Sequence, residues 1–207
     1  GATLGVRDYH DVFTWSHDLP RRARGGNLAY LQRTIPYFHA QGARYMNSEN
    51  SDSWGANGLG YWLTPRMLWR VSDAGEEACA ALVEDFLHHG FGPALEPMRS
   101  FYTLLNIDRS MMTSEHVTAM MYRHLAEARK SATALPDVMA RLDDLVLYTR
   151  YVELYHTYRE AAGDARQAAG RRFPGSLAAG GITEAQRAQR RGCLCRDGEA
   201  GIGLGDG

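Results

Sequence analysis

Cysteine is scarce in this chain of 207 residues, which holds only Cys79, Cys193 and Cys195. Cys79 falls in a helical pattern, where a small thiol is expected to pack as an inert apolar side chain. Cys193 and Cys195 form a C-x-C pair without a nearby histidine or a second cysteine pair, whereas structural zinc requires four ligands. The sequence therefore predicts no metal site and no bound cofactor.

Long apolar runs and an excess of one charge are also missing. No stretch approaches the roughly 20 apolar residues that a helix needs to cross a bilayer, and the first residues lack the pattern of a signal peptide. The 23 Lys and Arg residues nearly balance the 24 Asp and Glu residues, so no global field favours nucleic acid or an anionic membrane. We expect no nucleic-acid partner and no membrane partner, and composition assigns no cellular compartment.

Apolar residues make up 44% of the chain, enough for a sizeable core, and the patterns divide the chain into three parts. Residues 1–72 mix strand and helix patterns. Residues 73–162 have mostly helical spacing, with helices expected over about 115–131 and 136–162. Residues 163–207 are rich in Gly, Ala and Arg, a composition typical of a disordered tail. Because the chain opens on Gly1 in an apparent strand, we expect it to be a portion of a longer protein.

A strand, helix, strand pattern begins the chain. Residues 3–9 alternate as a strand, Asn27 is placed to cap a helix that reaches about residue 41, and residues 43–48 form a second strand. A short return loop is typical of a parallel unit, in which ligands gather beyond the carboxyl ends of the strands. We therefore expect two polar groups to meet at one rim: Asp8, Tyr9, His10 and Asp11 with Glu49, Asn50 and Asp52.

The turn after the second strand combines acidic, amide and aromatic side chains. Glu49 stands at the end of the strand, and Trp54 and Asn57 follow it. Turn formation and helix capping are the alternative explanation for Asn50 and Asp52, but Trp54 has no capping function. The composition is typical of a site for a polar, flat-faced ligand such as a sugar, on which Trp54 and Tyr61 would stack.

Two runs resemble the C-terminal part of a bacterial domain-of-unknown-function family that is related to barrel glycoside hydrolases of the alpha-glucuronidase and beta-hexosaminidase types. The resemblance is carried by N-S-E-N-S-D-S-W-G-A-N-G-L-G-Y-W-L-T-P-R-M-L-W and by D-F-L-H-H-G-F-G-P-A-L-E-P-M-R-S-F-Y. The similarity covers residues 1–160, and its specific parts are residues 49–69 and 86–102.

The resemblance implies a helix-rich α/β chain that holds the last βα units of a partial (β/α)8 barrel, followed by an α-helical extension. Glu49 and Trp54 would line a sugar site at the C-terminal face of that barrel, although the chain offers two strands where eight are needed. Glycoside cleavage normally requires two carboxyl groups. Glu49 is the candidate general acid or base; its partner is Asp8, Asp11, Asp18 or Asp52, or a carboxylate from another part of the barrel.

The sequence thus predicts a fragment of a glycoside hydrolase that binds carbohydrate and is inactive by itself, because part of the barrel site is absent. Hydrogen bonds to sugar hydroxyl groups would come from Tyr9, His10, Asn50 and Asn57. Two other hypotheses about the function stay open. A non-catalytic carbohydrate-binding protein would keep the aromatic residues without an acid and base pair, and a helical interaction module would rest on residues 72–162.

Overall fold

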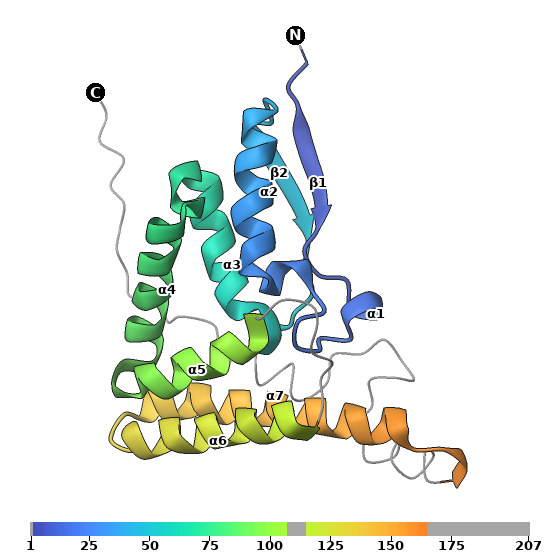
Figure 1. Cartoon of the computed structure of the whole chain (residues 1–207), viewed down its shortest axis with the longest axis vertical. Helices are drawn as coiled ribbons and strands as arrows, with labels where there is room; N and C mark the ends of the chain where they lie inside the picture. Colours follow the sequence, from blue (N-terminus) through green and yellow to red (C-terminus); the bar gives the residue numbers. More distant parts are fainter. Residues whose placement is uncertain (1, 107–114, 165–207) are drawn as a thin grey trace.

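The computed structural model describes residues 2–106 and 115–164, so nearly all of the predicted tail lies outside the described residues. Two strands, β1 (Gly5–Tyr9) and β2 (Tyr45–Glu49), pair in parallel. Helix α2 (Leu28–Ala40) connects them and lies along the sheet (Figure 1). The predicted strand, helix, strand unit and its parallel pairing are confirmed.

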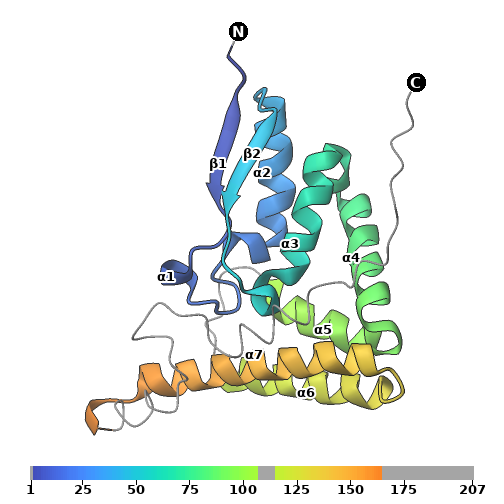
Figure 2. The same cartoon turned by 180° about the vertical axis from the view of Figure 1, so that it is seen from behind.

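Helices form most of the rest of the described chain. Between β1 and α2 lie the short helix α1 (Phe13–Ser16) and the 3-10 helix η1 (Arg24–Gly26). After β2 the elements are α3 (Trp54–Trp69), η2 (Val71–Ala74), α4 (Glu76–Phe91), η3 (Gly92–Ala94), α5 (Leu95–Asn106), α6 (Glu115–Ser131) and α7 (Pro136–Glu160). Helices α6 and α7 lie side by side as a hairpin beyond the carboxyl ends of the strands, as Figures 1 and 2 both show.

Local signals account for the ends of α2. The side-chain oxygen of Asn27 accepts a hydrogen bond from the backbone N–H of Tyr30 at 2.9 Å, which caps the helix as predicted. Gly42 has φ of +90° just after the helix, a backbone conformation that is strained for residues other than glycine.

Helix α3 begins at Trp54, so this tryptophan belongs to the first helical turn and not to the loop before it.

One hydrophobic core connects the longer helices of the described chain. It extends from Leu31 in α2 through Leu63 in α3 and Phe101 in α5 to Leu125 in α6 and Val152 in α7. Each large apolar side chain that is fully buried stabilises the fold by about 1.5 to 3 kcal/mol. The helical region is therefore the support on which the βα unit rests. Among the described helices, none has the length and apolar character that crossing a bilayer demands.

The two faces of the sheet differ. Asp8 faces α2, because its carboxylate accepts a hydrogen bond from the Tyr30 hydroxyl at 2.7 Å. Side chains alternate along a strand, so Arg7 and Tyr9 lie on the other face. Tyr45 shares that outer face, where its ring lies across Gly5: a Cβ atom at position 5 would meet the ring at 2.1 Å. This outer face is largely exposed.

Candidate functional site

The carboxyl ends of β1 and β2 bring the two predicted polar groups together. Tyr9 and Glu49 are partners in the parallel register. Just beyond them, the backbone N–H of Asp11 donates to the carbonyl oxygen of Glu49 at 3.1 Å. The residues that follow the two strands therefore share one rim, as the parallel pairing predicts.

Four exposed or partly exposed side chains form what we call the rim surface: Arg7, Tyr9, Trp15 and Glu49. The Arg7 guanidinium lies 3.1 Å from the Glu49 carboxylate and 5.2 Å from the centre of the Tyr9 ring. The rings of Tyr9 and Trp15 are 5.6 Å apart. Because Trp15 is 67% exposed and the Glu49 side chain 46% exposed, an aromatic platform and a carboxylate are both open to a ligand.

Trp15 is the residue of this surface that sequence reasoning missed. It lies in α1, a helix of four residues, which is too short to show the periodic spacing of apolar residues that predicts a helix. The one signal available is a tryptophan in the loop that follows a strand, which is the place where binding loops occur.

Asp8 lies beneath the rim and is held by several donors. Its carboxylate accepts hydrogen bonds from the Tyr30 hydroxyl at 2.7 Å, the Arg24 guanidinium at 3.1 Å and the backbone N–H of Tyr9 at 2.7 Å. Burial alone would raise the pKa of Asp8, but the hydrogen bonds from Tyr30, Tyr9 and the Arg24 guanidinium outweigh burial and lower it. Asp8 is thus an ionised anchor that ties β1 to α2.

A second buried network joins Asp11 to the turn and to α3. The Asp11 carboxylate, on a residue only 2% exposed, accepts hydrogen bonds at 2.6 Å from both the Ser51 hydroxyl and the Asn57 amide. The same hydroxyl lies 3.0 Å from a carboxylate oxygen of Asp18, and the Tyr61 hydroxyl donates to the carbonyl of Ser51 at 3.2 Å. Asn57 and Tyr61 are therefore bound within the protein and hold the loops that carry the rim surface.

The loop between β1 and α2 is strained. His17, Asp18 and Arg21 have φ of 50°, 54° and 64°, a left-handed conformation that costs a residue other than glycine about 1 to 3 kcal/mol. Two tyrosines of α7 hold this loop: the Tyr148 hydroxyl donates to the carbonyl of Asp18 at 3.0 Å and the Tyr151 hydroxyl to that of His17 at 2.6 Å. The helical region thus fixes the loop that presents Trp15.

The other predicted ligand-binding residues lie on the same side of the molecule. Asn50 and Asp52 are exposed in the turn, where the Asn50 amide donates to the carbonyl of Ser48 at 3.2 Å. Trp54 is partly exposed, and its ring meets Tyr61 edge-on at 5.4 Å. Trp54 and Asp52 are therefore accessible to a ligand.

His10 is almost fully buried at the base of this site. Burial is the main cause that lowers the pKa of His10; Arg24 acts in the same direction, while the Asp8 carboxylate, 3.6 Å away, opposes it. The folded chain therefore holds His10 neutral at a pH where the unfolded chain, with a histidine pKa of about 6.5, takes up a proton.

The stability of the protein is accordingly expected to depend on pH through His10. Its contribution is complete above about pH 6.5 and is lost below that pH, at up to about 1.4 kcal/mol per pH unit, until the lower pKa of the folded state is reached. Chemical denaturation at several pH values between neutral and mildly acidic measures this slope. His10→Asn should make the slope shallower, whereas His88→Asn, a change at an exposed position of α4, should leave it intact. Identical slopes for all three proteins would contradict a neutral, buried His10.

Residues 2–106 and 115–164 contain no group of three or more His, Cys, Asp or Glu side chains placed to hold a metal ion. Comparison of the chain with protein-family models, curated proteins and solved structures finds no match. The fold itself defines the class of this protein: a helix-rich α/β chain in which a parallel βα unit carries an exposed aromatic and acidic rim.

Proposed function

We propose that this chain binds carbohydrate at the rim surface and forms one wall of a glycoside-hydrolase-like site, with Glu49 as its acid or base. The observation that carries the proposal is the pairing of Glu49 with Tyr9 in register, next to the exposed ring of Trp15. A sugar ring offers apolar C–H faces to an aromatic platform and hydroxyl groups to charged side chains. Trp15 and Tyr9 supply the platform, and Glu49 and Arg7 supply the charges.

The carboxylates of the site divide into two kinds. Asp8 and Asp11 are buried and accept hydrogen bonds from protein donors, so neither carboxylate lies on the surface that a ligand reaches. Glu49 and Asp52 are exposed. Since glycoside cleavage needs two carboxyl groups on either side of the bond, Glu49 is the acid or base of this proposal, and its partner is Asp52 or a carboxylate outside the described residues.

We further propose that β1 and β2 belong to a larger parallel sheet, the (β/α)8 barrel that the family resemblance implies. Each strand has one hydrogen-bonded neighbour within the described chain. Parallel sheets normally have both faces covered, yet here the face with Arg7, Tyr45, Asn47 and Glu49 is exposed. In a barrel that face would line the interior, and Glu49 would stand at the C-terminal rim where active sites form.

Carbohydrate binding without hydrolysis is the second candidate. It is favoured by the burial of the Asp8 and Asp11 carboxylates, which leaves few exposed acids at the rim. Turnover of glycosides by a longer protein that contains this chain, lost in its Glu49→Gln variant, would support the hydrolase. Binding without turnover would support the second candidate.

Removal of the aromatic platform is expected to weaken sugar binding. Trp15→Ala should lower the affinity for uronic-acid or hexosamine oligosaccharides by about tenfold, because the stacking energy of one ring is lost. Isothermal titration calorimetry measures the effect. Trp69→Ala is the matched control. Trp69 is also an exposed tryptophan, but it lies at the carboxyl end of α3, away from the rim surface. Equal affinities for the two variants would remove the rim surface from sugar binding.

A further inference from the structure

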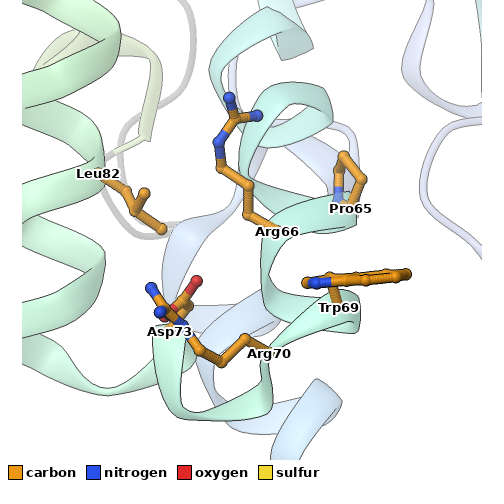
Figure 3. Close-up of a pocket in the computed structure, with 6 residues that line it drawn as sticks. All are labelled: Pro65, Arg66, Trp69, Arg70, Asp73 and Leu82. Atoms are coloured by element: carbon orange, nitrogen blue, oxygen red, sulfur yellow. The ribbon is translucent and has the colours of Figure 1, made fainter. Parts of the chain in front are cut away.

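A hollow lies at the carboxyl end of helix α3, away from the rim surface. Helix α3 runs away from the carboxyl ends of the strands and ends where it meets η2 and α4 (Figure 1). There, an open hollow of about 660 Å3 is lined by Pro65, Arg66, Trp69, Arg70, Asp73 and Leu82 (Figure 3). These residues come from three elements that the fold holds together.

Trp69 is the most exposed large apolar side chain among the described residues, at 93%. Its indole projects from the last turn of α3 beside Pro65 (Figure 3). An exposed tryptophan lacks the stabilisation that burial of its large apolar surface would bring. Tryptophan and arginine are also the residues most enriched among those that dominate binding energy at protein interfaces.

Both arginines of the hollow are held in place by contacts within the protein. The Arg66 guanidinium lies 3.4 Å from the centre of the Trp62 ring and donates to the carbonyl of Trp62 at 3.0 Å. Arg70 donates to the Asp73 carboxylate at 2.5 Å, so the one acid of the lining is neutralised. Arg66 takes part in no ion pair within the described chain, and the lining carries a net positive charge.

We propose that this hollow docks an acidic peptide segment of a partner protein. An apolar side chain of the segment covers the Trp69 indole, and a carboxylate pairs with Arg66. Because Trp62 already fixes the Arg66 guanidinium, little side-chain freedom is lost on binding. A small molecule would need a more enclosed site, one that buries most of its surface, whereas an extended peptide can cover an open hollow and an exposed ring together.

The test is selection from a display library of random dodecapeptides on the chain, followed by affinity measurements on synthetic copies of the enriched peptides. The enriched peptides are expected to carry two or more acidic residues around an apolar one. Trp69→Ala and Arg66→Gln should each weaken their binding by about tenfold or more. Replacement of the acidic residues of the peptide by their amides should have a similar effect, and added salt should weaken binding as well.

Trp15→Ala is the matched control, because it removes an exposed indole that lies in α1, away from the hollow. It should leave peptide binding unchanged. The proposal is overturned if no peptide is enriched, if the enriched peptides lack acidic residues, or if they bind Trp69→Ala as tightly as the unmodified chain. Circular dichroism of each variant, compared with that of the unmodified chain, confirms that the surface changes leave the fold intact.

Discussion

Replacement of Gly60 by alanine is expected to destabilise the fold by about 3 kcal/mol or more, well above the effect of most single substitutions. Helix α3 packs at this point directly on the backbone of η1. A Cβ atom at position 60 would lie 1.5 Å from the carbonyl oxygen of Gly25 and 2.7 Å from its carbonyl carbon. Gly25 cannot give way easily, because its N–H donates to the carbonyl of His10 at 2.8 Å and so ties η1 to the end of β1.

Gly58→Ala is the matched control for this prediction. It makes the same substitution in the same helix, but its Cβ atom would lie at an ordinary distance of 3.6 Å from the Trp54 ring. Alanine favours the helix over glycine by about 1 kcal/mol, so Gly58→Ala should be neutral or stabilising. Urea denaturation measures both variants. Similar stabilities for the two would show that α3 does not pack on η1 in this way.

Asn57→Asp is expected to cost about 3 to 5 kcal/mol at neutral pH, because it places an uncompensated charge in a buried site. Asn57 is 2% exposed, and its amide donates to the Asp11 carboxylate at 2.6 Å. A carboxylate at position 57 removes this donor and repels Asp11. The destabilisation should shrink at mildly acidic pH, since protonation of the introduced acid restores a donor.

Asn50→Asp makes the same chemical change at an exposed position of the turn. It should alter the free energy of unfolding by less than about 0.5 kcal/mol. Chemical denaturation of both variants at neutral and at mildly acidic pH provides the comparison. A loss of stability at Asn57→Asp that did not depend on pH would contradict the contact of position 57 with the Asp11 carboxylate.

Much of the fold follows from local sequence signals. The cap at Asn27 and the apolar spacing after it predict α2, and the short return to a second strand predicts the parallel pair. The predicted helix over residues 115–131 matches α6, and that over 136–162 matches α7 to within two residues at its end. These elements are specified by residues within a few positions of one another.

The site was harder to predict because its contacts are distant in sequence. Asn57 and Asp11 are 46 positions apart, and no spacing rule reveals that the amide is bound to that carboxylate and not open to a ligand. Trp15 becomes part of the site only through its contact with Tyr9. Glu49 lies at the end of its strand as expected, but its pairing with Arg7 needed the parallel register. The resemblance to barrel glycoside hydrolases stays a prediction.

The central claim is that the rim surface binds sugar, and an NMR titration of the chain with a glucuronic-acid disaccharide tests it most directly. Backbone and indole N–H signals of Tyr9, Trp15 and Glu49 should shift together with a single dissociation constant, while those of Trp69 and its neighbours at the far end of α3 stay in place. The absence of shifts at the rim surface, or shifts confined to the end of α3, would contradict the claim.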